Sequence, residues 1–206
     1  LYIGSLDKTG NSFKRFQTLQ AMGYQIEGID IEPYIFDSIW MRFHFHLCFG
    51  PGIFALNKKV LQKTHETNPD IIWVDNKPYL NKNTLSKLKK QFPHTKIVNI
   101  ITDDPFGKYH YAWRAIYKTF KFYDVHFVQR EINISELKRH GANRVETCFR
   151  SFDPGFHRII QNEELTLDPY KTSVGFVGSY EEEREDYINF LIQHGIPVSI
   201  TGDGWE

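Results

Sequence analysis

The stretch that most constrains the fold runs from Lys96 to Pro105, with the sequence KIVNIITDDP. Four of five successive residues are apolar and rich in β-branched side chains (Ile97, Val98, Ile100 and Ile101). Such a run is typical of a strand that is buried on both faces of a parallel sheet. Because proline has no N–H group and disfavours helical geometry in the residue before it, we expect this strand to end in a loop.

Two carboxylates, Asp103 and Asp104, stand at the end of this predicted strand. In open α/β sheets, ligands bind outside the carboxyl ends of the strands, so both residues are candidates for the chemistry of the protein. In the alternative interpretation, Asp104 caps the following helix and Asp103 is only solvated.

Composition indicates a folded protein without an overall preference for nucleic acid. The 206 residues are 41% hydrophobic and 16% aromatic, which can build a sizeable core. Lys plus Arg and Asp plus Glu number 25 each, so no general basic excess is present. Cys48 and Cys148 fit neither a disulfide framework nor a zinc pattern, and we expect a cytoplasmic protein without a transmembrane segment.

The chain opens with a strand, a loop and a helix. We expect strands at 1–4 and 24–31 and a helix from Phe13 to Met22, which Gly23 ends. The polar loop at 5–12 could present N–H groups to a phosphate, but it lacks the GxGxxG and Walker patterns, and a plain connection is the simpler interpretation.

The pattern of short strands continues through the next hundred residues. The region 33–68 is aromatic and helical in pattern and is interrupted at Gly50-Pro51-Gly52. His44 and His46 point to different faces of a helix, so we interpret them as packing or surface residues. The remaining expected strands lie at 71–74, 96–102, 124–129 and 145–149, and the expected helices at 84–92 and 132–140.

The segment 106–123 is unusually aromatic. We expect a helix packed on the sheet for most of it. Aromatic side chains beside a cleft are also what a sugar ring stacks on. Tyr109 and His110 lie nearest to the predicted strand end and are therefore candidate acceptor-binding residues.

A second domain begins near the C-terminus. The polar stretch 154–170 is interpreted as a linker, after which a strand (173–177), a helix (180–194) and a strand (197–201) follow. We expect Tyr187, Phe190 and Leu191 to face inward. We predict a Rossmann-like N-terminal domain with a parallel sheet over residues 1–168. A single βαβ unit leaves its hydrophobic faces uncovered, so we predict that residues 169–206 are the incomplete start of a second Rossmann-like domain.

Several motifs occur together in an order that resembles one family. They are Asp103-Asp104-Pro105, the stretch DVHFVQ, His140-Gly141-Ala142, Ser151-Phe152-Asp153-Pro154, the stretch VGFVGS with Arg184, and Gly202-Asp203-Gly204-Trp205. From about Pro69 to the C-terminus, this order resembles the spore-maturation CgeB-like glycosyltransferases, which have the GT-B architecture.

The resemblance implies a nucleotide-sugar-dependent glycosyltransferase with an acceptor-side N-terminal domain and a donor-side C-terminal domain. It implies that Asp103 or Asp104 lies beside the transferred sugar. The resemblance places the donor diphosphate near Gly178, Ser179 and Arg184, and the nucleotide near Gly202 and Gly204. Related enzymes often carry a basic residue directly after the first glycine, where this chain has Ser179. Without the resemblance, Arg184 is interpreted as a partner for glutamates on its own helix. Gly202 and Gly204 would let the backbone approach a nucleotide closely, and a simple turn is the alternative.

We therefore expect transfer of a sugar from a nucleotide-sugar to a hydroxyl acceptor such as a glycan or cell-surface polymer, with no cofactor and no obligatory metal. The family's acidic donor-binding motif lies further along a full-length chain, so we expect these 206 residues alone to bind donor poorly. Two alternatives remain open. One is a non-catalytic GT-B-like module that binds a carbohydrate or a partner, and the other is a receiver-like or nucleotide-binding α/β domain.

Overall fold

A computed structural model describes residues 1–36, 39–150, 152 and 174–205. It divides into two compact units, one within residues 1–153 and one within residues 154–206. The expected boundary between residues 168 and 169, and the expected linker around it, lie outside the described residues.

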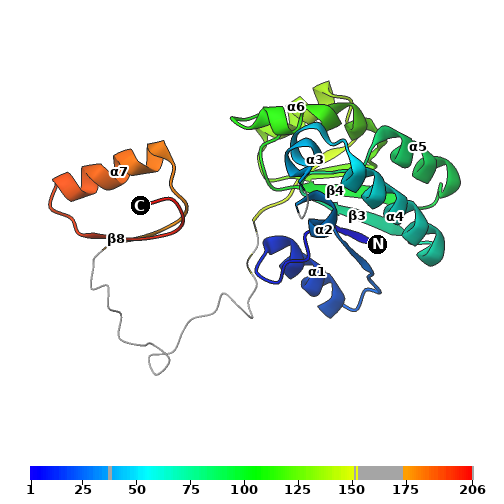
Figure 1. The fold of residues 1–206 in the computed structure, drawn as a ribbon, viewed down its shortest axis with the longest axis horizontal. Coiled ribbons are helices and arrows are strands. Elements are labelled where there is room, and N and C mark those ends of the chain that lie inside the picture. Colours follow the sequence, from blue (N-terminus) through cyan, green and yellow to red (C-terminus); the bar gives the residue numbers. More distant parts are fainter. Residues whose placement is uncertain (37–38, 151, 153–173, 206) are drawn as a thin grey trace. The chain divides into compact units, whose positions relative to one another are not determined.

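The first unit is built on a six-stranded parallel sheet with the order β2-β1-β3-β4-β5-β6 (Figure 1). The strands are β1 (Tyr2–Gly4), β2 (Gly28–Asp30), β3 (Ile71–Asp75), β4 (Lys96–Ile101), β5 (Val125–Val128) and β6 (Val145–Thr147). Tyr2 is in register with both Gly28 of β2 and Trp73 of β3. The chain therefore reverses its winding direction at β1, and the switch point lies between β1 and β3.

Helices cover the two faces of this sheet unequally. Helix α1 (Asn11–Ala21) lies on one face (Figure 1). The opposite face carries α2 (Glu32–Ile35), α3 (Met41–Leu47), α4 (Pro51–Thr67), α5 (Lys82–Gln91), α6 (Ile132–Arg139) and the 3₁₀ helices η1 (His110–Ala112) and η2 (Arg114–Phe122).

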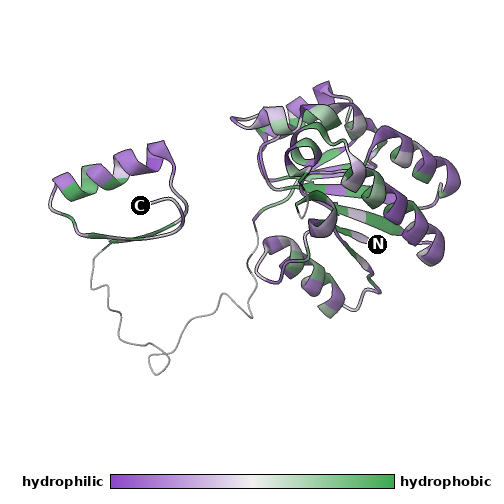
Figure 2. Ribbon diagram, viewed as in Figure 1, coloured by the Kyte–Doolittle hydropathy of each residue, from purple (hydrophilic) through white to green (hydrophobic). Residues whose placement is uncertain are grey.

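This asymmetry explains the burial along β4. Ile97, Asn99 and Ile101 are fully buried beneath the larger helical layer, whereas Val98 and Ile100 on the other face are only half-buried. The expectation that this strand is buried on both faces is therefore met on one face only. Figure 2 shows hydrophobic strands inside and hydrophilic outer helix surfaces, which is the pattern of a covered sheet.

Most of the predicted elements are present, and the α/β, Rossmann-like class is confirmed for the first unit. Gly23 ends α1 with a φ of +90°, as expected from its lack of a side chain. The strand expected at 24–31 is shorter and is confined to Gly28–Asp30. The aromatic segment forms 3₁₀ rather than α-helix, and the three-residue spacing of the buried Trp113, Ile116 and Thr119 suits that tighter helix.

The second unit contains β7 (Val174–Val177), α7 (Glu182–Gln193) and β8 (Val198–Thr201), and its two strands are parallel. Ile188 is the buried side chain of α7. The expectation that Tyr187 and Phe190 face inward is wrong, because they are 75% and 59% exposed, while Leu191 is half-buried. A two-stranded sheet offers one helix too little surface to cover three large side chains.

Candidate functional site

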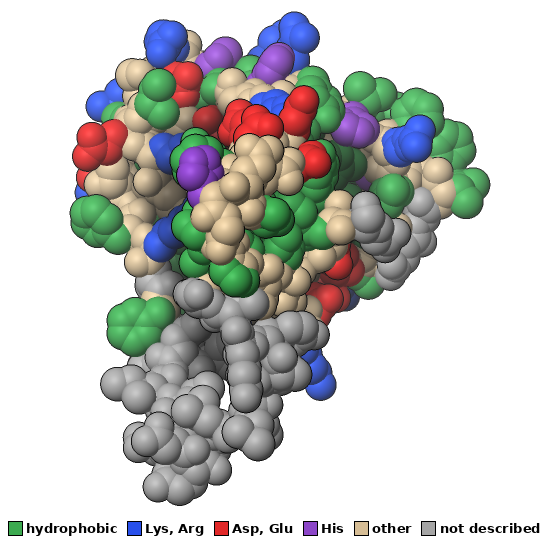
Figure 3. Space-filling model, turned by 90° about the vertical axis from the view of Figure 1, so that its left-hand side faces the viewer, with side chains coloured by type: hydrophobic (Ala, Val, Ile, Leu, Met, Phe, Trp, Pro, Cys, Tyr) green, Lys and Arg blue, Asp and Glu red, His purple; other side chains and the backbone are tan. Residues whose placement is uncertain are grey.

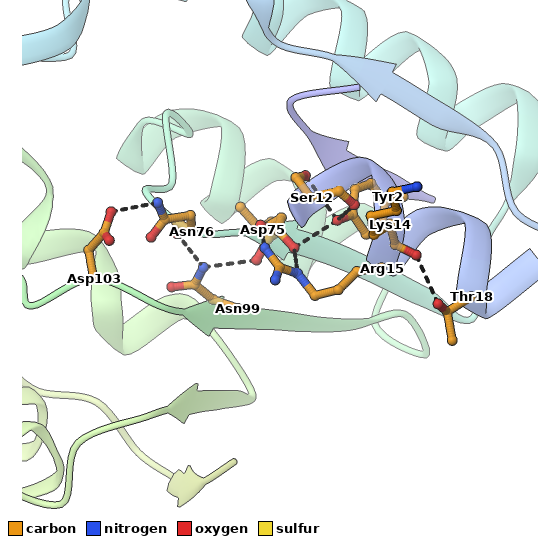
Figure 4. Close-up of polar contacts among 10 residues, drawn as sticks. Tyr2, Ser12, Lys14, Arg15, Thr18, Asp75, Asn76, Asn99 and Asp103 are labelled. Atoms are coloured by element: carbon orange, nitrogen blue, oxygen red, sulfur yellow. Dashed lines mark hydrogen bonds and ion pairs between the residues drawn. The ribbon is translucent and has the colours of Figure 1, made fainter. Parts of the chain in front are cut away.

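Polar side chains meet where β1, β3 and β4 end, beside the switch point of the sheet (Figure 4). This is the edge at which open α/β sheets bind ligands. The group consists of a buried network around Asp75 and an adjoining chain of side chains that reaches the surface at Asp103.

The buried network joins α1 to the sheet. Arg15 donates from Nε to Asp75 Oδ2 (2.6 Å) and from Nη2 to Asp75 Oδ1 (2.7 Å), which is a bidentate ion pair. The Tyr2 hydroxyl donates to Asp75 Oδ2 (2.7 Å), and the Ser12 hydroxyl lies 3.0 Å from the phenol oxygen. Burial and the nearby Asp75 carboxylate raise the pKa of Tyr2, so the phenol keeps its proton as a donor.

Gly4 makes this approach of α1 possible. A Cβ atom at position 4 would lie 2.5 Å from Ser12 Oγ and 2.9 Å from Asp75 Cβ. Any larger residue would therefore push the start of α1 away from the carboxyl end of β3.

Asn76 connects the buried network to the surface. Its backbone has a φ of +55°, a left-handed conformation that asparagine tolerates, and its N–H group donates to the carbonyl of Ile100 (2.7 Å). The carbonyl of Asn76 accepts from Asn99 Nδ2 (2.9 Å), and its side-chain Nδ2 donates to Asp103 Oδ2 (2.8 Å). The exposed Asp103 carboxylate is thus held by a residue that is itself fixed on both sides.

Asp104 has a different environment. Its Oδ1 accepts from the backbone N–H of Phe106 (3.0 Å) and from Asn133 Nδ2 of α6 (2.9 Å). A Cβ atom at Gly107 would lie 2.8 Å from Asp104 Oδ2, so the loop folds tightly around this carboxylate. Asp104 therefore organises the loop and does not cap the following helix, whose N-cap is Tyr109 and has no side-chain hydrogen bond; Asp103 is the carboxylate that faces solvent.

Below this surface, Asn99 lies beside a buried histidine. Asn99 Oδ1 lies 3.2 Å from His126 Nδ1, and His126 Nε2 lies 2.9 Å from the carbonyl of Phe120. A neutral imidazole has one N–H group, which the shorter contact assigns to the Phe120 carbonyl. Burial outweighs this hydrogen bond and lowers the pKa of His126 to about 4, so the ring is neutral at pH 7.

The candidate acceptor residues lie on the loop that follows β4. Tyr109 is 57% exposed and packs edge-on against Tyr111, with ring centroids 6.2 Å apart. His110 is exposed, and its Nδ1 lies 3.1 Å from the carbonyl of Gly107. Both side chains are available to a ligand on the same loop as Asp103 and Asp104.

The second unit brings together the five residues that the resemblance assigns to the donor. A Cβ atom at Gly202, where φ is +149°, would lie 2.1 Å from the carbonyl oxygen of Gly178, so the loops after β7 and β8 are in close contact. Trp205 Nε1 donates to the same carbonyl (2.8 Å). Gly204, with a φ of +81°, turns the chain so that this indole can reach it.

Arg184 belongs to α7, and its side chain lies against the Gly178–Ser179 loop. Its Nη1 donates to the carbonyl of Ser179 (2.7 Å), and its Nη2 pairs with Glu181 Oε1 (3.1 Å). The guanidinium therefore makes the local ion pair expected from its own helix, and it also touches the loop that the resemblance assigns to the diphosphate. Because this ion pair is exposed, it is weak, and an anion can replace Glu181 as the partner.

Replacing Gly202 by Ala is expected to separate the two loops, because the new methyl group would overlap the Gly178 carbonyl at a strained backbone angle. The Trp205 indole N–H signal in a ¹H–¹⁵N spectrum should then shift, and its hydrogen exchange should accelerate. Gly175→Ala is the matched control, since no heavy atom lies within 4 Å of its added Cβ. Equal spectra for the two variants would contradict the close contact.

The site residues thus form two groups, one in each unit, and the sequence interpretation missed the buried part of the first. Arg15, Asp75, Asn76 and Asn99 were not selected, although a signal for two of them exists. Asp75 ends a buried strand just as Asp103 follows one, and Asn99 is a polar residue inside an apolar strand, where it needs hydrogen-bond partners.

No protein-family model matches this chain, and no curated protein matches it either. Among the described residues, no three His, Cys, Asp or Glu side chains lie close enough together to hold a metal ion. Within those same ranges, none of the helices combines the length and the apolar character needed to cross a bilayer.

Proposed function

We propose that this chain is a nucleotide-sugar-dependent glycosyltransferase, or the N-terminal portion of one, with the two-domain GT-B architecture. It transfers a sugar to the hydroxyl group of an acceptor such as a glycan or a cell-surface polymer. In this proposal the first unit receives the acceptor, and the second unit is the beginning of the donor-binding domain.

One observation carries the proposal. The second unit is a separate parallel βαβ unit whose strand-end loops are held against each other by the Gly202–Gly178 approach and the Trp205 hydrogen bond. Glycine loops at the carboxyl ends of parallel strands are where an α/β fold accommodates a diphosphate, because backbone N–H groups can approach it closely. The order of motifs in the sequence adds support.

The first unit supplies a candidate general base. Asp103 is exposed, follows a central strand and is oriented by the Asn76 amide. A carboxylate in this position can accept the proton of an acceptor hydroxyl as that oxygen attacks the sugar. Asp104 is assigned to positioning the loop instead, because its carboxylate already accepts from Phe106 and Asn133.

The second unit supplies positive charge for the leaving group. When the sugar is transferred, negative charge builds up on the departing nucleotide diphosphate. Arg184 can stabilise that charge through charge-assisted hydrogen bonds, together with the backbone N–H group of Ser179, since those of Gly178 and Tyr180 already donate to the carbonyls of Thr201 and Asp203. In this role Arg184 exchanges its exposed Glu181 partner for phosphate oxygens.

The test is release of the nucleotide from a panel of UDP-, GDP-, TDP- and CMP-linked sugars by the longest natural form of the protein. Asp103→Asn is expected to lower the transfer rate by about 10²- to 10⁴-fold, because the amide cannot accept the proton. Donor binding, followed by calorimetry, should change little.

Asp70→Asn is the matched control, since Asp70 is an exposed carboxylate that directly precedes β3, at the opposite edge of the sheet. It should keep the full rate. Turnover that Asp103→Asn leaves intact would remove Asp103 from the mechanism. If no donor is turned over and the Asp103 variant is indistinguishable from the unaltered protein, the chain is a non-catalytic binding module instead.

A further inference from the structure

We infer that the first unit binds the surface of an anionic lipid membrane. The binding surface is formed by residues 39–65 and 105–123, which we call the aromatic–cationic surface. This inference does not require the proposed transfer reaction, although the segment 105–123 includes the candidate acceptor residues Tyr109 and His110.

The two segments lie side by side and share an unusual charge. The His46 and Tyr111 rings, one from each segment, are 5.5 Å apart, and α3 also contacts η1 and η2. Neither segment contains an Asp or Glu, although the whole chain has 25 of them. Their Lys and Arg residues are Arg42, Lys58, Lys59, Lys63, Lys108, Arg114, Lys118 and Lys121. A charge-balanced protein thus has eight cations and no carboxylate within these two segments, although Lys63 pairs with Glu27 and Glu66 from outside them.

The same region exposes large apolar side chains. Six of them, between 45% and 96% exposed, follow one another around α3 and the start of α4: Ile39, Trp40, Phe43, Leu47, Phe49 and Phe54. Five of these line a groove of about 410 Å³ together with Gly50 and Pro51. In Figure 3, hydrophobic side chains at the right-hand edge stand next to Lys or Arg and His side chains.

The apolar side chains are held outward by contacts beneath them. The buried His44 accepts the N–H of Gly52 at Nε2 (3.2 Å), which fixes the end of α3 against the start of α4. The buried Lys77 donates to the carbonyl of Phe45 and lies 4.5 Å from the centre of its ring. Since α3 is anchored by its inner face, its outer residues remain at the surface.

A lipid surface fits these features better than other occupants. Aromatic side chains favour the boundary between headgroups and acyl chains, apolar residues enter it, and nearby cations pair with anionic headgroups. A symmetric second copy would bring the cations of both copies together, which is repulsive. Nucleic acid would satisfy the cations and aromatic rings but not the aliphatic Ile39, Met41 and Leu47.

The experiment measures binding of the full chain to vesicles of phosphatidylcholine alone and of phosphatidylcholine mixed with phosphatidylglycerol. Binding to the mixed vesicles and its weakening by salt are expected. Arg42→Gln with Lys58→Gln should weaken binding by about 30-fold. Phe43→Ser with Phe54→Ser, both at exposed positions, should abolish detectable binding.

Two matched double variants serve as controls. Lys8→Gln with Lys138→Gln removes two exposed cations elsewhere, and Tyr187→Ser with Phe190→Ser removes two exposed aromatic rings of the second unit. Both should bind vesicles like the unaltered chain. Equal binding to the two vesicle types, retained binding in either test variant, or preferred binding to single-stranded nucleic acid overturns the inference. A dimer that the phenylalanine variant disrupts, in a chain that ignores vesicles, overturns it as well.

Discussion

Replacing Asp75 by Ala is expected to lower the free energy of unfolding by about 3 kcal/mol. Asp75 is 3% exposed and accepts three hydrogen bonds, two from Arg15 and one from Tyr2. Its removal leaves the Arg15 guanidinium without its acceptor at the place where α1 meets the sheet, whereas the Tyr2 hydroxyl can still donate to the carbonyl of Ser12. The Arg15 side chain is 25% exposed, so water can hydrate part of the unpaired guanidinium. The expected loss of stability therefore lies at the lower end of the range for buried ion pairs. Urea denaturation at pH 7 measures it.

An exposed ion pair provides the control for this prediction. Arg144 Nε and Glu146 Oε1 are 2.9 Å apart on the surface, and Glu146→Ala should cost less than about 1 kcal/mol. The double variant Arg15→Met with Asp75→Ala should recover part of the stability, because it no longer buries an unpaired charge. Equal losses for Asp75→Ala and Glu146→Ala would show that the buried network does not hold α1 in place.

Lowering the pH is expected to destabilise the first unit through His126. A histidine in the unfolded chain takes up a proton near pH 6.5, whereas His126 in the folded protein stays neutral down to about pH 4. Between these two values the unfolded state binds more protons, so the free energy of unfolding falls as the pH is lowered. The shift corresponds to about 3 kcal/mol, which is fully present above pH 6.5 and is lost by about pH 4.

Thermal or urea unfolding measured across this pH range tests the prediction. His126→Gln keeps a donor for the Phe120 carbonyl but cannot titrate, so it should lose the slope that the unaltered protein shows. His94→Gln changes an exposed histidine and should keep that slope. An unchanged pH dependence in the His126 variant would mean that other groups cause the acid sensitivity.

The fold was predictable from the sequence because its central strands coincide with short apolar runs. The runs at 71–74 and 96–102 appear as β3 and β4 with nearly the same bounds, and Gly23 ends its helix as expected. The 3₁₀ form of η2 was not predictable, since it depends on how Trp113 and Ile116 pack against the sheet rather than on local propensity. The prediction that Tyr187 and Phe190 face inward was wrong, because the two-stranded sheet is too small to cover both side chains.

The candidate site was predictable only where it follows a strand directly. Asp103 and the Gly178 loop could be selected because a ligand edge lies at the carboxyl ends of strands. Arg15 could not be selected, because the sequence does not show whether an arginine on a helix surface contacts water or a distant residue such as Asp75. The separate roles of Asp103 and Asp104 were likewise invisible, since the contact of Asp104 with Asn133 joins residues from two distant segments.

The position of β1 in the sheet has a consequence for how the chain folds. The pair β1–β2 and each neighbouring pair from β3 to β6 are closed by short crossovers, whereas the pairing of Tyr2 in β1 with Trp73 in β3 joins residues much further apart in the chain. Closing the longer loop costs more entropy, so we expect β3 to β6 to form a nucleus that the unit of β1, α1 and β2 joins afterwards. We therefore expect the Arg15–Asp75 contact to form after the transition state, so that its loss accelerates unfolding and leaves the rate of folding nearly unchanged.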